Sequence, residues 1–335
     1  MQKLLPLFTR KLSAIVFSSV FLMLLFVSCK DYTEDTRDIC CNDCSRISLN
    51  YRYIRIDDDE YGTFIKTMRH FLFDEKGLFI KEIKNNSDNS QNLVISGLAA
   101  GGYSVLTIAN SSVEVFNPEL VEGKTELNKL HLILPKQSTG QIDDCSPLYW
   151  NLQKIVVPGK DECALKQKYI CDLSNIHCRL KVTVAWESLP PGDGEYSIEL
   201  SDISTEYSLY SPDNYNLNIK DGVVHNFPFH TEVAGTHYCK KVKLFDLKLE
   251  TEFRTFRYFE DRIPYISVYY KGKAITDKIN LKRAFLEWGW NVNKRPEQIY
   301  NIQFTILKDG SVVLSQWFEG SVEDWQDGGS INISK

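Results

Sequence analysis

Apolar and polar residues alternate with a period of two along most of this chain. The clearest example is Leu180–Trp186, where every second residue is apolar and the residues between include Lys181 and Thr183. Such alternation predicts a β-strand with one buried face. The segments with this pattern, or with a short apolar run between turn residues, are 47–53, 71–73, 78–80, 93–95, 103–108, 130–134, 148–157, 180–186, 196–200, 242–249, 265–270, 300–306 and 312–314. Many short strands are typical of sandwiches and barrels.

Helices should be few and short, because no long segment has a helical period; residues 160–173 are the best candidate. The strand pattern restarts at Arg179, well after Pro158-Gly159 end the preceding strand candidate. We therefore expect an all-β fold with two β-sandwich domains, residues 46–175 and 176–335, that meet near residues 170–180. The length is sufficient for two ordinary domains.

The N-terminus predicts a lipoprotein signal peptide over residues 1–28. An apolar run covers about 15–27 and ends at Ser28-Cys29; three basic residues precede it, Lys3, Arg10 and Lys11. A thiol is required at position 29, since only cysteine forms the thioether to diacylglycerol. A transmembrane helix is the alternative, but the run is short for a span and abuts the N-terminus. We therefore expect Cys29 to be lipidated and to become the mature N-terminus.

Residues 29–45 are polar and predict a tether behind the lipid. Lys30-Asp31 and then Glu34-Asp35 follow the lipidated cysteine. This resembles the acidic signal with which Bacteroidota-type lipoproteins are transferred to the outer face of the outer membrane. We expect a lipid-anchored, surface-exposed protein of the outer membrane, in which acyl chains such as palmitate supply the attachment.

Eight cysteines remain after Cys29, and their even number in an exported chain predicts disulfides. They are Cys40, Cys41, Cys44, Cys145, Cys163, Cys171, Cys178 and Cys239. The spacing leaves the pairing open, although at least one local bridge is expected among the four cysteines from 145 to 178. The Cys40-Cys41-x-x-Cys44 pattern could also supply thiolate ligands to a metal, but no second pair lies at zinc-ribbon spacing.

Charge and motifs argue against a nucleic-acid partner and against an enzyme. The net charge is −5, and no basic stripe with interleaved aromatics occurs. Hydrolase, phosphate-loop and zinc-protease motifs are all absent from the sequence. We expect no catalytic residue, no cofactor and no metal.

Three clusters could still bind a ligand, and each has a plainer interpretation. The acidic run Asp57–Glu60 with Gly62 resembles a calcium loop but has Met68 where the loop needs Glu, so an acidic turn is favoured. His225, His230, His237 and Cys239 could ligate a metal but match no metal motif, so surface histidines near a disulfide are favoured. Trp288-Gly289-Trp290 and Trp317-Phe318 could stack on sugars, although core packing is the commoner use of aromatics in a β-protein.

The signal peptide, the tether and the doubled β pattern together resemble the FimB/Mfa-type fimbrial anchor and minor-subunit lipoproteins of Bacteroidales. Local resemblances are Phe71–Phe79 for the first-domain hairpin, Arg179–Trp186 with Leu189 and Tyr196–Ile198 for the opening of the second domain, and Val322–Trp325 for the closing strand. The resemblance covers residues 29–335 in architecture and those patches in detail.

The resemblance implies transthyretin-like sandwich domains and a role in fibre assembly. Subunits of that family join by β-strand exchange, in which one chain's strand fills a groove in another's sheet. The expected partners are therefore fimbrial subunits and, through the lipid, the outer membrane. An outer-membrane glycan-binding lipoprotein of a nutrient-uptake system is the alternative.

Overall fold

The computed structural model describes residues 46–55, 58–85, 90–135, 142–159, 167–210, 215–220, 223–227, 237–316 and 331–333. The chain divides into two compact units. The larger consists of residues 49–93, 102–155 and 169–335, and the smaller of 1–48, 94–101 and 156–168. Both sheets that position the candidate site lie in the larger unit. The segments predicted to be the signal peptide (1–28) and the tether (29–45) lie outside the described residues.

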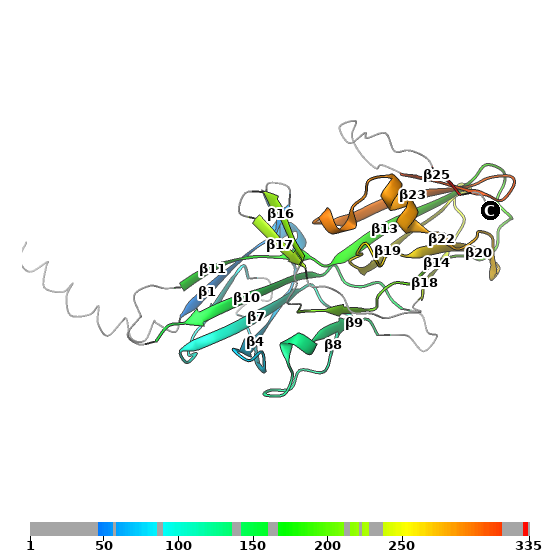
Figure 1. Cartoon of the computed structure of the whole chain (residues 1–335). Helices are drawn as coiled ribbons and strands as arrows, with labels where there is room; N and C mark the ends of the chain where they lie inside the picture. Colours follow the sequence, from blue (N-terminus) through cyan, green and yellow to red (C-terminus); the bar gives the residue numbers. More distant parts are fainter. Residues whose placement is uncertain are drawn as a thin grey trace, which may run out of the picture. The chain divides into compact units, whose positions relative to one another are not determined.

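A five-stranded sheet dominates the N-terminal half (Figure 1). Its order is β12 (Ser174–Asn175), β10 (Tyr149–Val157), β7 (Gly101–Ala109), β4 (Met68–Asp74) and β5 (Phe79–Ile83). Strand β4 shows how its two faces differ. Phe71 and Phe73 join the main hydrophobic cluster, whereas His70 faces the ring of Tyr51 at 5.2 Å. Both faces of β4 are therefore covered.

Smaller elements complete this half. A three-stranded sheet has the order β11 (Gln167–Asp172), β1 (Ile47–Arg52) and β6 (Asn92–Ile95), and β2 (Ile54–Arg55) pairs with β3 (Asp58–Asp59). Helix α3 (Tyr61–Phe64) and the 3-10 turn η1 (Leu127–Lys129) are each a single turn. Another three-stranded sheet orders β15 (Glu206–Ser208), β9 (His131–Ile133) and β8 (Val115–Asn117). Strand β15 thus pairs with β9 from across the expected boundary near residues 170–180.

Two sheets form the C-terminal half. One has the order β19 (Leu249–Phe256), β13 (His177–Trp186), β23 (Gln298–Ile306), β24 (Val312–Gln316) and β25 (Ile331–Ile333). Strands β13 and β23 run parallel over nine residue pairs, from Cys178–Gln298 to Trp186–Ile306. The other sheet has the order β18 (His237–Val242), β14 (Tyr196–Ser201), β20 (Tyr265–Tyr270) and β21 (Lys273–Ala274), and β22 (Ile279–Asn280) also pairs with β20.

The remaining described elements are short. Helix α4 (Leu281–Glu287) begins at Asn280, whose side chain accepts a hydrogen bond from the backbone of Lys282 and so caps the first turn. The 3-10 turn η3 (Val292–Lys294) follows, and β16 (Tyr215–Lys220) pairs with β17 (Val223–Phe227). In the part of the chain that the structure describes, no helix is long and apolar enough to cross a bilayer.

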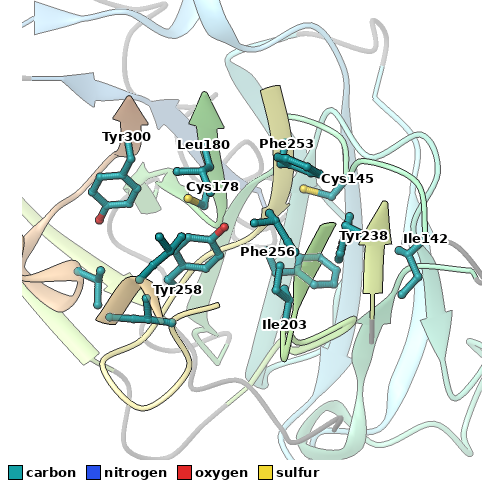
Figure 2. Packing of buried hydrophobic residues seen from close by; sticks show 14 of the residues in the cluster. Ile142, Cys145, Cys178, Leu180, Ile203, Tyr238, Phe253, Phe256, Tyr258 and Tyr300 are labelled. Atoms are coloured by element: carbon teal, nitrogen blue, oxygen red, sulfur yellow. The ribbon is translucent and has the colours of Figure 1, made fainter. Parts of the chain in front are cut away.

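One hydrophobic cluster runs through both halves. It includes Phe71 and Leu132 from the N-terminal half and Val182, Tyr196 and Phe304 from the C-terminal half. Alternation along β13, β14 and β23 turns every second side chain towards this cluster, as expected for two sheets that face each other. Figure 2 shows part of the cluster, with Tyr258 beside Cys178 and with Cys145 near Phe253 and Tyr238.

The structure confirms the all-β prediction and most of the predicted strands. Two predictions were wrong. The segment 242–249 is not one strand, because β18 ends at Val242 and β19 begins at Leu249, with a tight turn between them. The helix expected over 160–173 is instead strand β11 from Gln167; residues 160–166 lie outside the described residues. The domain limits 46–175 and 176–335 stay predictions.

Candidate assembly edge

The C-terminal strands β24 and β25 form one edge of the five-stranded sheet. Strand β25 has three residues and pairs antiparallel with β24, with Val312 opposite Ile333, Val313 opposite Asn332 and Leu314 opposite Ile331. No other strand of this sheet lies beyond β25 in the described chain. A short outermost strand is held by few backbone hydrogen bonds and leaves its own outer backbone groups unpaired.

Strand β24 is held much more firmly than β25. Val312 and Leu314 are 4% and 0% exposed and belong to the hydrophobic cluster, while Val313 and Ser315, which alternate with them, are half-buried on the outer face. Five residue pairs join β24 to β23. If β25 leaves, β24 therefore remains as a preformed edge with its inward side chains still buried.

The turn between β23 and β24 is fixed by local hydrogen bonds. Gly310 has φ +82°, a left-handed conformation that favours glycine, and its N–H donates to the carbonyl of Leu307 at 3.0 Å. The Asp309 carboxylate accepts from the backbone and hydroxyl of Ser311 at 2.9 and 2.6 Å. Glu187, which follows β13, accepts from the backbone N–H of Lys308 at 2.9 Å. These hydrogen bonds hold the turn, and with it the beginning of β24, in a fixed position.

The outer face of the same sheet is polar and holds a shallow cavity of about 490 Å³. Its lining residues are Arg179, Lys181, Glu250, Thr251, Glu252, Ile299 and Asn301. Arg179 donates two hydrogen bonds to Glu252, at 3.2 and 2.8 Å. These hydrogen bonds lower the pKa of the Glu252 carboxyl and raise the pKa of the Arg179 guanidinium, so both groups stay charged at neutral pH.

A second charged group joins the beginning of the described chain to strand β23. Glu297, one residue before β23, accepts a hydrogen bond from the Tyr53 hydroxyl at 2.5 Å and another from Arg55 at 2.7 Å. Burial and the Glu297 charge raise the pKa of Tyr53, so its hydroxyl remains protonated and can donate. The segment that follows β1 is thereby held to the sheet that carries the edge.

The four described cysteines are free thiols, so no bridge joins any two of them. Cys178 packs against Tyr258, Cys171 lies 3.8 Å from the Gln153 side chain, and Cys145 sits among buried residues of the cluster. Burial raises the pKa of the Cys171 thiol to about 12 and also raises the pKa of Cys145 and Cys178, which makes these thiols unreactive. The local bridge expected among residues 145–178 is thus not formed between described cysteines, because each thiol packs separately. Cys29, Cys40, Cys41, Cys44 and Cys163 lie outside the described residues, so their predicted roles stay predictions.

The other clusters named from the sequence have structural explanations or lie outside the described chain. The Asp59 carboxylate accepts from the backbone N–H groups of Tyr53 and Tyr61, so it closes a turn. Trp290 is 9% exposed and packs between Phe285 and Tyr300, with ring centroids 5.1 and 5.0 Å away. Within the described residues, no three His, Cys, Asp or Glu side chains are placed to hold a metal ion. Asp57, His230, Trp317 and Phe318, and the side chains of His225 and His237, are not described.

A family model of the fimbrillin-A associated anchor proteins Mfa1 and Mfa2 matches residues 40–326. The chain belongs to this family. No curated protein sequence matches the chain significantly. The family predicted from the sequence is therefore confirmed. The closing strand expected at Val322–Trp325 lies outside the described residues and stays a prediction. As a member of a fimbrial anchor family, this protein is associated with fimbriae and with the cell surface.

Solved structures share the fold of this family member at low sequence identity. The fimbrial anchor protein Mfa2 from Porphyromonas gingivalis is 16% identical with a TM-score of 0.61, and the match covers 82% of this chain and 97% of that one. A provisionally named adhesin from Bacteroides ovatus is 15% identical with a TM-score of 0.61, covering 82% and 96%. A protein provisionally described as polysaccharide-binding, from Bacteroides thetaiotaomicron, is 16% identical with a TM-score of 0.59, covering 84% and 99%.

Sequence reasoning predicted strand β24 of this anchor-family protein but not β25 at Ile331–Ile333, and it missed two further features. The Tyr53–Arg55–Glu297 contact joins residues more than 240 positions apart, and no local pattern signals such a pairing. The exposed turn at 243–248 was hidden because its apolar residues continue the strand pattern. Asp246 next to Leu247 was the available signal, since Asp is depleted in strands and tolerated in turns.

Proposed function

We propose that the protein is a surface lipoprotein that serves as an anchor or minor subunit of a fimbria, joined to other subunits by β-strand exchange at the β24–β25 edge. The observation that carries this proposal is the contrast between the two strands: β25 is held by three residue pairs, whereas β24 is built into the core. A strand that departs leaves a preformed slot, and main-chain hydrogen bonds to an incoming strand can replace those lost.

Attachment to the outer membrane completes the proposal. Cys29 carries the lipid, and residues 29–45 tether the β-sheets to it. The acyl chains add about 0.8 kcal/mol of membrane affinity for each buried methylene, so several chains hold the protein firmly. Replacing Cys29 with Ala should abolish acyl labelling and membrane retention; unchanged labelling would contradict the lipid assignment.

A disulfide staple across the edge tests the exchange directly. Val313 and Asn332 are opposite each other in the ladder, and directly paired residues approach closely enough for a bridge. The Val313→Cys/Asn332→Cys protein should reach the membrane but hold few fibres, and reductant should restore fibre attachment. Val313→Cys alone is the control, because it has the same outer-face change without the bridge. Full fibre attachment with the bridge formed would refute exchange at this edge.

Deletion of Gly320–Lys335 removes β25 together with the segment before it. The shortened lipoprotein should still reach the membrane and should lose its hold on fibres. Electron microscopy of cells lacking the whole gene gives the reference for fibre number, length and attachment. If those cells are indistinguishable from the parent, the fimbrial role is wrong.

Glycan binding is the second candidate function, and the polar cavity on the outer sheet face favours it. Charged and amide side chains line that cavity and can hydrogen-bond hydroxyl groups. A relative with the same fold is provisionally described as polysaccharide-binding. Exposed coplanar aromatic rings would strengthen this reading, but the Trp288 and Trp290 rings are inclined at 61° and Trp290 is buried. Calorimetric titration with host and dietary glycans decides it, and Asn301→Ala should weaken any binding.

A further inference from the structure

Strand β19 forms the edge of its sheet that lies opposite β25. It has eight residues, against three in β25, and in the described chain it pairs with no strand other than β13. A long strand at a sheet edge presents a row of backbone N–H and C=O groups, which is a template for pairing with another chain. The sheet therefore has a second edge at which a strand could be added, unless β19 is covered.

The segment 142–148, which leads into β10, covers the middle of this edge. The Cys145 N–H donates to the Arg254 carbonyl at 2.9 Å, and the Arg254 N–H donates to the Asp144 carboxylate at 3.1 Å. The carboxylate thus occupies the place that a backbone carbonyl of a neighbouring strand would take. Both outward backbone groups of Arg254 are satisfied in this way without a pairing strand.

Lys240 of β18 closes the next outward position along the edge. Its ammonium group donates both to the Asp144 carboxylate and to the Glu252 carbonyl. The same ammonium lies over the Phe253 ring, 5.3 Å from the ring centroid. An incoming strand would have to displace this charge before its own N–H could reach the Glu252 carbonyl, and charged groups at sheet edges are a general means of preventing edge pairing. We call Asp144 and Lys240 the guard pair.

Contacts with the rest of the protein fix segment 142–148 at the edge. Glu114 accepts a hydrogen bond from the Ser146 N–H at 2.5 Å. Cys145 is buried in the hydrophobic cluster beside Phe253 (Figure 2). The segment cannot leave β19 without exposing Cys145 and breaking the hydrogen bond to Glu114, so the guard pair stays in place in the folded protein.

We propose that the guard pair keeps the β19 edge from accepting a strand, and that the strand it excludes is β19 of a second copy of this chain. Glu252 and Arg254 carry opposite charges two residues apart. Antiparallel pairing of two β19 strands about Phe253 would place each of these side chains opposite the other, which favours the pairing. Such a contact is self-complementary and closes a twofold dimer.

The guard pair would therefore leave the β24–β25 edge as the site where this sheet gains a strand. This consequence rests on the proposed function, because it concerns strand exchange at that edge. The exclusion of a second copy at β19 does not depend on fimbriae. A test of self-association in the absence of fibres therefore separates a failure of the guard from a failure of the proposed function.

Sedimentation equilibrium of the full-length lipoprotein, in detergent micelles matched to the density of the solvent, measures self-association. Asp144→Ala removes the acceptor for the Arg254 N–H and the ion-pair partner of Lys240. This variant should self-associate with a dissociation constant at least about tenfold lower than that of the parent protein. Glu287→Ala is the matched control, because it also removes the carboxylate of an ion pair, with Arg283 at 2.8 Å, but lies on α4 and not at a sheet edge.

Two further variants identify the interface and guard against a folding defect. Lys240→Met removes the ammonium but keeps an unbranched side chain over Phe253, and it should also strengthen self-association. It decides the question if Asp144→Ala does not melt cooperatively. Glu252→Lys added to Asp144→Ala puts like charges opposite each other across the proposed dimer, so it should weaken the association that Asp144→Ala creates.

Every result supports or overturns the proposal. A folded Asp144→Ala protein that self-associates no more than the parent protein overturns it. Equal association of Glu287→Ala overturns it too, since the effect would then be a general loss of charge. Association that Glu252→Lys leaves unchanged places the interface elsewhere and has the same consequence. If Asp144→Ala and Lys240→Met both fail to fold, the pair is required for the fold itself and is not a guard.

Discussion

At the scale of single residues, two buried histidines make stability depend on pH. His177 and His70 are 4% and 1% exposed, and burial lowers the pKa of each imidazole to about 4. In the unfolded chain the same groups titrate near 6.5. The unfolded state therefore binds more protons between those values, and the free energy of unfolding should fall as the pH drops from about 6.5 to about 4. Each histidine accounts for roughly 3 kcal/mol over that window.

Urea unfolding at pH 7.5, 6, 5 and 4.5 measures this loss. His177→Gln can keep a donor for the Leu148 carbonyl, which lies 3.0 Å from the imidazole Nδ1, and should flatten the slope between pH 6.5 and 4.5. Carboxylates titrate alike in the variant and the parent protein, so their effect cancels in the difference. An identical slope in both proteins would show that His177 does not control the pH dependence.

At the scale of elements, the turn between β18 and β19 provides the clearest stability prediction. Leu247→Gly places a residue that tolerates positive φ at 59° and should raise the free energy of unfolding by about 0.5–1 kcal/mol. Lys273→Gly in strand β21 is the opposite control, because glycine within a strand costs about the same amount. Chemical denaturation of the parent protein and the two variants measures the free energy of unfolding, which should rise for Leu247→Gly and fall for Lys273→Gly. A lower value for Leu247→Gly would contradict the inference that the turn is strained.

Periodicity predicted the strands well because most of them bury one face. Along β23, five of nine residues are buried and alternate strictly with partly exposed ones, so the pattern is visible in the sequence. Periodicity gave the wrong secondary structure where contacts with distant parts of the chain determine it. Residues 160–173 looked helical, yet Gln167–Asp172 pairs as a strand, and α4 is too short to show a helical period.

The candidate edge was predictable only in part. The β23–β24 hairpin is local in sequence and has a Gly in its turn, so it was predicted correctly. The parallel pairing of β23 with β13 joins residues 120 positions apart. The sequence of neither strand indicates which other strand it pairs with. The place of β24 and β25 in the sheet depends on this long-range pairing, which explains why sequence alone could not give the strand order inward of the edge.

At the scale of the whole molecule, the shared hydrophobic cluster predicts that the halves depend on each other for stability. Strand β15 completes a sheet with β9 and β8, and Tyr207 on β15 is fully buried in the shared cluster. A fragment of residues 46–175 would lack these partners and should not fold stably alone. Amide exchange and nuclear magnetic resonance spectra of the fragment, compared with residues 46–335, check this. A well-dispersed spectrum with protected amides in β9 would instead support an independent domain.

The contact around Glu297 should couple the segment after β1 energetically to the start of strand β23. Tyr53→Phe and Glu297→Gln each remove part of a charge-assisted hydrogen bond, which typically contributes about 1.5–3 kcal/mol. In a double-mutant cycle the two changes should be less than additive, by about 1 kcal/mol. Strict additivity in urea unfolding would mean that the two side chains do not interact in solution.

The unequal lengths of the strand ladders have a mechanical consequence. In the proposed assembly, a fibre dragged by flow would pull on the incoming strand that has replaced β25, while the proposed lipid anchor resists at the other terminus. That load would cross the three or so residue positions that β25 occupies on β24, then five residue pairs between β24 and β23, and then nine between β23 and β13. Resistance to rupture therefore rises inward, and the outermost ladder yields first. Breakage would then detach the fibre and leave the tethered subunit folded and ready to be loaded again.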